Sequence, residues 1–271
     1  MAHFKKPWQY LIHFPKVIWA FVAERPTCLL STGSGRLGLV PFLIARLTGV
    51  KFIHIETFSH VHRLTKMGRI VRFFGQPVYS QWESPSKKVI YLGPIINNSP
   101  YVERAIIRQN HIFVTAGTRY EPFPRLLKAV EDLKRSGIIK QRVIVQAGYT
   151  KYDSEFMEIF GFCPPQEIDR LIAGALFVIT QESAGIATKC LKSSTRFLVL
   201  PRSFSQGELP ARSDMNEDLH LRLAEMGFTE VVHTSKEMEA AIGRIDKLKT
   251  GFPFDNSRAL TVLRSLIDSG T

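Results

Sequence analysis

The feature that most constrains this chain is a repeated order of short apolar runs, glycine-containing loops and helix-like stretches. Such an order is typical of a parallel sheet with crossover helices, because a strand in that sheet is buried on both faces. The sequence predicts strands at Thr27–Ser31, Val50–Glu56, Pro77–Gln81, Lys88–Leu92, Ile112–Thr115, Arg142–Gln146, Leu176–Thr180, Phe197–Leu200 and, more briefly, Glu230–Val232.

Helix-like stretches separate these runs, and the whole pattern occurs twice along 271 residues. This length also suits two domains. The expected fold is α/β, with doubly wound, Rossmann-like domains at residues 1–110 and 111–271 facing a ligand cleft. Helices are expected at Leu37–Leu47, Leu64–Phe74, Phe123–Ser136, Gln166–Ala173, Gly185–Leu191, Asp214–Met226, Lys236–Lys247 and Ser257–Ile267, with a connecting segment or helix at Tyr101–Asn110.

The positive charge lies almost entirely in the first portion of the chain. Up to Asn110, fifteen Lys and Arg residues face only four Glu residues, so +11 of the net +12 belongs there. A one-sided positive field attracts nucleic acid, anionic lipid or phosphorylated substrates. No helix-turn-helix, zinc-finger or RNP-like motif is present, which argues against nucleic acid.

The segment Trp8–Ala23 is apolar and aromatic, but His13, Pro15 and Lys16 interrupt it. These interruptions leave it short of the roughly 20 consecutive apolar residues of a membrane span, and they also divide the apolar core that a signal peptide needs. Aromatic side chains beside lysines suit a helix in the headgroup region, while packing on its own domain or on another subunit is the alternative. The pattern of this segment alone leaves both possibilities open.

Three loops that follow predicted strands could bind phosphate, because backbone N–H groups are free where a helix begins. They are Thr32–Gly35, Thr115–Thr118 and Gln181–Gly185, and the last is best placed. Glu182 within it would repel a diphosphate, so it more plausibly faces sugar hydroxyls or caps the helix.

Other nucleotide chemistries fit less well. No P-loop motif occurs, which disfavours a kinase of that type. Gly33, Gly35 and Gly38 do have the Gly-x-Gly-x-x-Gly spacing, and Glu56 ends the next strand, so a nucleotide-dependent oxidoreductase stays an alternative. His54, His60 and His62 lack a zinc-like spacing, and no metal site is expected. The widely separated Cys28, Cys163 and Cys190 indicate a reducing compartment.

Read with their flanks, these loops resemble glycosyltransferase family 28, specifically its bipartite UDP-sugar transferases. That group builds lipid-linked oligosaccharides for N-glycosylation and bacterial exopolysaccharides, often with acceptor and donor halves on separate chains. The resemblance rests on segments in the family's order: Ser31–Gly33, Ile53–Phe58, Thr65–Ile70, Ser80–Glu83 and Val89–Pro94 in the acceptor half, and Ile112–Thr118, Pro122–Phe123, Val145–Tyr149, Leu200–Arg202 and Gly207–Glu208 in the donor half.

The resemblance implies a GT-B fold and an inverting, metal-free transfer of a hexose, GlcNAc-type or other, from a UDP-sugar to a polyprenyl-pyrophosphate-linked acceptor. It implies no cofactor. It also implies a cytoplasmic protein, peripheral to the cytosolic face of a membrane, with its first half docked on the anionic membrane surface. Thr32, Gly33, Ser34 and Gly35 would contact the acceptor, with Glu56 as the expected base or, equally, a loop-fixing hydrogen-bond acceptor. The expected donor contacts are Thr115, Gly117, Thr118, Gln146, Gly148, Gln181, Glu182, Ser183, Ala184, Gly185, Arg202, Glu208, Asp214 and Asn216.

The chain departs from the family pattern in three places. The first domain lacks the family's opening strand and its Gly-rich, histidine-ended loop, so it is expected to be short, with an unpaired edge that a second polypeptide could complete. The donor motif reads Gln181–Ile186 without its leading histidine. The late Asn-Asp-His-Gln signature retains only Asp214. A noncatalytic subunit of such a transferase is the main alternative.

Overall fold

The computed structural model describes residues 8–33, 38–84, 86, 88–97, 109–211 and 217–268, with side chains from residue 15 onward. Within these ranges the chain divides into two compact units. The first comprises residues 1–97 and 254–271, and the second residues 98–253. Ser34, Gly35, Asp214 and Asn216, together with most of the segment 101–110, lie outside the described residues.

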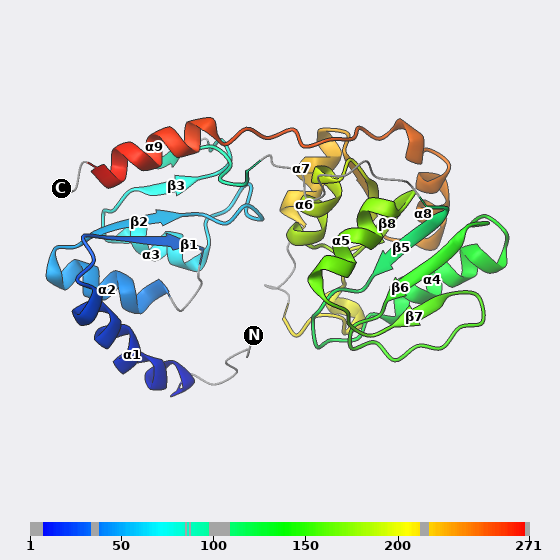
Figure 1. The fold of residues 1–271 in the computed structure, drawn as a ribbon, viewed down its shortest axis with the longest axis horizontal. Coiled ribbons are helices and arrows are strands. Elements are labelled where there is room, and N and C mark those ends of the chain that lie inside the picture. Colours follow the sequence, from blue (N-terminus) through cyan, green and yellow to red (C-terminus); the bar gives the residue numbers. More distant parts are fainter. Residues whose placement is uncertain are drawn as a thin grey trace. The chain divides into compact units, whose positions relative to one another are not determined.

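The first unit is built on a four-stranded parallel sheet in the order β1-β2-β3-β4 (Figure 1). Helix α1 precedes the sheet, and α9 returns to it from the far end of the chain. The bounds of its elements are α1 Trp8–Glu24, β1 Cys28–Thr32, α2 Leu39–Thr48, β2 Lys51–Ile55, α3 Lys66–Phe73, β3 Val78–Ser80, β4 Val89–Tyr91 and α9 Ser257–Asp268.

Alternate residues of this sheet form two separate apolar layers, as the period of two in a strand requires. On one face, Phe52 and Val78 pack with Phe42 of α2 and Met67 of α3. The opposite face is covered by α9, which Figure 1 shows running along the strands on the side away from α2 and α3.

The contact with α9 corrects the predicted boundary. Residues 111–271 were expected to form one domain, but Ala259 of α9 is buried in the first unit against Ile53, Ile55, Tyr79 and Leu92. The period of its apolar residues predicted the helix, and nothing local in the sequence shows which sheet the helix covers.

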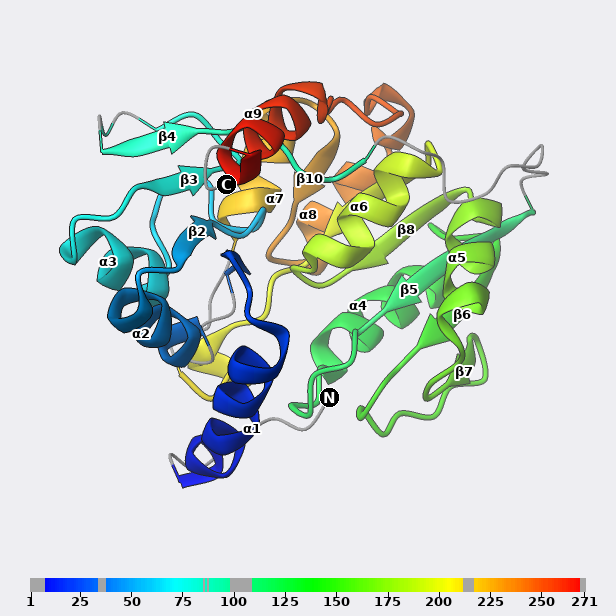
Figure 2. The same cartoon turned by 60° about the vertical axis from the view of Figure 1, so that its left-hand side comes forward.

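The second unit contains a six-stranded parallel sheet in the order β10-β9-β8-β5-β6-β7. Its main core lies between one face of the sheet and helices α4 and α8, and α5, α6 and α7 form a second layer (Figure 2). The bounds are β5 His111–Thr115, α4 Pro124–Arg135, β6 Arg142–Gln146, β7 Glu158–Phe160, α5 Pro165–Gly174, β8 Phe177–Thr180, α6 Ala184–Lys192, β9 Arg196–Val199, α7 Asp218–Glu225, β10 Thr229–Val231 and α8 Ser235–Ile242.

The nine predicted strands are present, each within one or two residues of its expected bounds. Strand β7 at Glu158–Phe160 is an addition that the sequence did not suggest. It is short, half exposed and at the edge of the sheet beside β6, so it lacks the continuous apolar run that marks the inner strands.

The packing of α9 yields a test by substitution. Ala259→Asp places a carboxylate in the layer beneath β2 and β3, where it has no partner, so α9 should detach from the sheet. Hydrogen exchange followed by mass spectrometry should then rise by at least about tenfold in peptides over residues 51–55 and 78–80. Peptides over residues 142–146 should stay protected. Leu260→Asp, on the neighbouring exposed position of the same helix, is the matched control and should leave all three regions unchanged.

Candidate functional site

The carboxyl ends of β5, β6 and β8 bring together the loops that the sequence singled out in the second unit. Strand β5 lies between β8 and β6, so the loops at residues 116–118, 147–149 and 181–183 are neighbours. The buried Thr115 hydroxyl donates to Gln146 Oε1 over 2.8 Å and accepts from the Gly117 N–H over 3.0 Å. Thr115 and Gln146 thereby fix the first two loops to each other, while the Thr118 side chain is exposed.

Two glycines make this close approach possible. Gly117 has φ +77°, and a Cβ there would lie 1.8 Å from Nε2 of Gln181. Gly148 has φ +60°, and its Cβ would lie 2.3 Å from the Gly117 carbonyl oxygen. Both the left-handed backbone and the lack of space exclude a side chain. The loop after β6 therefore packs on the backbone of the loop after β5, which in turn packs on the Gln181 side chain after β8.

Helix α6 begins at this edge, directly after the loop that follows β8. Ser183 has extended backbone dihedrals and its hydroxyl accepts from the Ile186 N–H over 3.3 Å, so it is the N-cap. Ser183 and Ala184 are half-buried, Gly185 is exposed, and the nearest atom to a Cβ on Gly185 is 3.9 Å away. The first turn is open to solvent and presents the positive end of the helix dipole.

Arg202 is buried beneath these loops rather than directed out of them. Its guanidinium donates to the Ala116 carbonyl over 2.9 Å, to the Glu121 carbonyl over 2.8 Å and to the Gln181 side chain. It also stacks on the Phe123 ring at 4.6 Å. Burial lowers the pKa of Arg202, against the opposing effect of Glu182. We interpret Arg202 as a residue that positions the loops, and its contact with a donor stays a prediction.

Two carboxylates complete this framework. Glu208 is buried and accepts from Arg125 at both oxygens, over 2.9 and 2.8 Å, and from the Ser203 N–H over 2.7 Å. Glu182 accepts from the Arg202 N–H over 2.8 Å. Burial raises the pKa of Glu182, although hydrogen bonds and nearby arginines oppose this. Glu182 thus ties the loop after β8 to the loop after β9, and neither carboxylate caps α6.

His220 of α7 lies beneath the start of α6 and was not noticed in the sequence. Its side chain is buried, and neither ring nitrogen has a hydrogen-bond partner within the described parts of the chain. Burial lowers the pKa of His220 to about 4, with a smaller opposing effect from the Ser183 backbone. The ring is therefore neutral at physiological pH.

In the first unit, the two described members of the predicted acceptor loop lie at the end of β1. Thr32 is exposed, and Gly33 has φ +63° with no room for a side chain, since a Cβ would lie 2.0 Å from Cγ2 of Thr57. The loop after β1 therefore packs directly on the loop after β2, in which Thr57 follows Glu56.

Glu56 ends β2 and is only 1% exposed. Its Oε1 accepts from both the N–H and the hydroxyl of Thr65, each over 3.0 Å, and Thr65 is the N-cap of α3. His54 Nε2 lies 3.7 Å from the same oxygen. Oε2 has no hydrogen-bond partner among the described residues. Glu56 thus fixes the loop before α3 through one oxygen, and its role as a base stays a prediction.

Among the described residues, no group of three or more His, Cys, Asp or Glu side chains could hold a metal ion. The three histidines around Glu56 do not form one. His54 instead contacts the Ser31 hydroxyl at 3.2 Å, and His60 contacts the Thr57 hydroxyl at 3.1 Å.

No protein-family model and no curated protein sequence matches the chain. Several solved structures do match the chain. The S. aureus MnaA–UDP co-structure has a TM-score of 0.68 at 12% identity, over 99% of this chain and 80% of that one. A glycotransferase of kitacinnamycin has a TM-score of 0.58 at 13% identity, over 100% and 81%. Acinetobacter baumannii MurG has a TM-score of 0.56 at 16% identity, over 97% and 73%.

These comparisons confirm the predicted fold: the chain has the GT-B arrangement of two parallel-sheet α/β domains. The chain spans about four fifths of the length of these two glycosyltransferase structures. At such low identity the likeness concerns the fold alone.

The buried neutral His220 yields a prediction of pH dependence. Its folded pKa of about 4 lies below the unfolded value of 6.5, so stability is full above pH 6.5 and is lost as the pH falls towards 4. At pH 4.5 the loss from this one ring should be on the order of 2–3 kcal/mol. Urea unfolding at pH 7 and pH 4.5 should show a smaller acid loss for His220→Leu than for the wild type. The exposed His233→Gln should lose as much as the wild type, and identical losses in all three proteins would contradict a buried neutral ring.

Proposed function

We propose that this chain is a UDP-sugar-dependent glycosyltransferase that transfers a hexose, with inversion, to a polyprenyl-pyrophosphate-linked acceptor. The observation that carries the proposal is the open first turn of α6, placed among the glycine loops of β5 and β6. A helix start of this kind favours a diphosphate, because its N–H groups have no partner in the helix.

In this reaction, the acceptor hydroxyl oxygen forms a bond to the anomeric carbon while the bond from that carbon to the UDP oxygen breaks. Negative charge develops on the departing diphosphate, and the amides of Ala184 and Gly185 would stabilise it. The exposed Thr118 hydroxyl is a further donor at the same edge. Arg202, Glu182 and Glu208 contribute by holding the loops in place.

The proton of the acceptor hydroxyl needs a base. We assign the role of this base to Glu56. Its Oε2 is buried without a hydrogen-bond partner among the described residues, while its Oε1 accepts hydrogen bonds from Thr65. Such a fixed carboxylate has one free oxygen of defined direction, which is what a positioned base requires. Thr32 and Gly33 belong to the neighbouring loop and remain our candidates for acceptor contact.

The similar structures support the choice of donor. MnaA was solved with UDP, and the Methanocaldococcus jannaschii and Neisseria meningitidis 2-epimerases were solved with UDP-GlcNAc. MurG and the kitacinnamycin enzyme share this fold with the epimerases, so the fold does not distinguish transfer from epimerisation. The order of motifs shared with family 28 is what favours transfer for this chain.

Helix α1 and strand β1 support the proposed membrane surface and second polypeptide. No helix in the described part of the chain is long and apolar enough to cross a membrane. Trp19 and Val22 of α1 are nevertheless 72% and 65% exposed, with Lys16 on the same helix. Strand β1 is the edge of its sheet and leaves Leu30 exposed, so its outer backbone groups could pair with another strand.

The donor site can be tested with a charge added to α6. Gly185→Asp places a carboxylate on the open first turn, where it stabilises the helix but repels a diphosphate. Calorimetry should show micromolar UDP binding by the wild type and at least about tenfold weaker binding by the variant, without a lower melting temperature. Gly137→Asp, in the loop between α4 and β6 at the opposite edge of the sheet, makes the same charge change and should bind UDP normally. Equal affinity in all three proteins would exclude α6 as the diphosphate site.

The membrane proposal has its own test. Trp19→Gln with Val22→Gln removes exposed apolar area from α1, so co-sedimentation with vesicles containing anionic phospholipid should weaken by at least about tenfold. Leu221→Gln, at a leucine of α7 that is 45% exposed, serves as the control and should sediment like the wild type. Sedimentation that is unchanged by the α1 substitutions would place the membrane contact elsewhere.

A further inference from the structure

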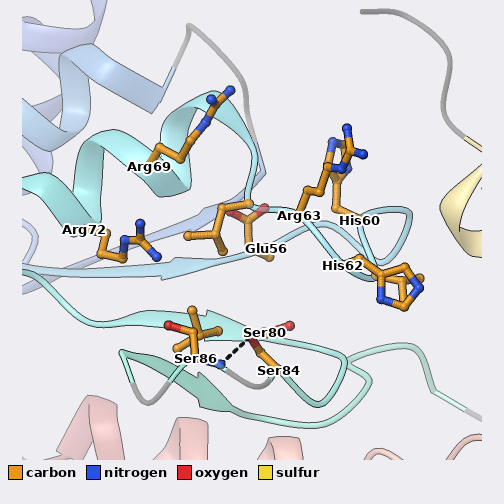
Figure 3. A pocket seen from close by; sticks show the side chains of 12 residues that line it. Glu56, His60, His62, Arg63, Arg69, Arg72, Ser80, Ser84 and Ser86 are labelled. Carbon is orange, nitrogen blue, oxygen red and sulfur yellow. Dashed lines mark hydrogen bonds between the residues drawn. The ribbon is translucent and has the colours of Figure 1, made fainter.

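A pocket of about 470 Å³ opens on the first unit, whereas α6 belongs to the second. We call it the basic pocket, and its polar wall comprises Arg63, Arg69, Arg72, Glu56, Ser84 and Ser86. Arg69 and Arg72 lie on α3, Arg63 precedes that helix, and the serines lie between β3 and β4 (Figure 3). Figure 3 shows Glu56 between Arg72 on one side and Arg63 on the other.

The three arginines of the basic pocket have no charge partner in the part of the chain that the structure describes. None of them has an ion pair or a side-chain hydrogen bond to another described residue, although all three are exposed. Exposed arginines in the second unit differ, since Arg142, Arg170 and Arg222 each pair with a glutamate. Arginines that converge on one pocket without a carboxylate partner attract an anion, and their planar donors fit phosphoryl oxygens.

The floor of the basic pocket favours a hydrogen-bond donor, whereas the arginines favour an anion. Glu56 Oε2 is buried there without a hydrogen-bond partner among the described residues, and Thr65 holds the other oxygen so that the carboxylate cannot turn away. A buried acceptor left unsatisfied is costly, and a ligand that brings an O–H or N–H donor removes that cost. A bare phosphate at the floor would instead be repelled by the carboxylate.

We propose that the basic pocket binds a phosphorylated sugar, with its phosphoryl group at the arginines and a hydroxyl donating to Glu56 Oε2. Only a ligand with both groups can bind the arginines, which form the rim of the pocket, and also donate a hydrogen bond to Glu56 at its floor. This inference rests on the proposed function, in which Glu56 takes the proton of the acceptor hydroxyl, and it adds the arginines as the site of the phosphoryl group. Its test is separate, because sugar-phosphate binding in the first unit is measured independently of UDP binding at α6. The ligand's source is either a free sugar phosphate or the headgroup of a lipid that carries one.

Equilibrium dialysis with radiolabelled glucose 1-phosphate tests the rim. Arg69→Gln with Arg72→Gln should weaken binding by at least about tenfold. Lys66→Gln with Arg264→Gln removes the same charge from exposed positions of the same unit outside the pocket, and should change the affinity less than about twofold. Equal weakening by the two pairs would overturn the proposal, as would binding that UDP displaces and the arginine substitutions do not affect.

Glu56→Gln tests the floor, because the amide replaces an acceptor by a donor and removes a negative charge. The variant should bind glucose 1-phosphate more weakly than the wild type but inorganic phosphate more tightly. An unchanged ratio of the two affinities would contradict a hydroxyl at Glu56.

A prenyl ester of glucose 1-phosphate tests the source of the ligand. Tighter binding of the ester than of the free sugar phosphate supports the pocket with a lipid headgroup as its source, and equal or weaker binding supports it with a soluble one.

Discussion

The second unit depends on one buried guanidinium. Arg202 reaches from the loop after β9 to the loops after β5 and β8, and its donors are taken by carbonyl and amide oxygens of those loops. Because a buried cation must be fully hydrogen-bonded, this arrangement allows little variation in loop geometry. Gly117 and Gly148 supply the space that such close loops need, and Ser183 then begins α6 at a fixed point on the edge. The candidate donor site is thus rigid by construction.

The two units handle charge in contrasting ways. In the second unit, Arg125 pairs with Glu208 at two oxygens, and the exposed arginines of its helices have glutamate partners nearby. In the first unit, fifteen basic residues stand against four acidic ones before Asn110, and the arginines of the basic pocket have no ion-pair partner among the described residues. Unpaired cations raise the energy of the free protein slightly and lower that of a complex with an anion. The excess of positive charge in the first part of the sequence therefore includes the arginines of the basic pocket.

Much of the fold was predictable because buried parallel strands appear as apolar runs, and glycine or serine marks the loops that follow them. This pattern predicts the loops that hold Thr115 and Ser183, while Gln146 follows from the resemblance to family 28, and contact of all three with a donor stays a prediction. What the sequence did not reveal depends on contacts between distant residues. The roles of Arg202 and His220 depend on burial against other loops and helices, and β7 is an edge strand with weak patterning. The basic pocket combines residues from α3 and two loops, whose spacing in the sequence forms no motif.

The docking of α9 on the first sheet has a consequence for synthesis on the ribosome. Ala259 and its helix neighbours cover Ile53 and Ile55, yet they are translated after the whole of the second unit. Chains emerge from their amino terminus, so the earlier unit waits with one apolar face open while the later one becomes complete. The order of folding should then run opposite to the order of the units in the chain. During that interval the nascent protein exposes apolar surface and is most prone to aggregate.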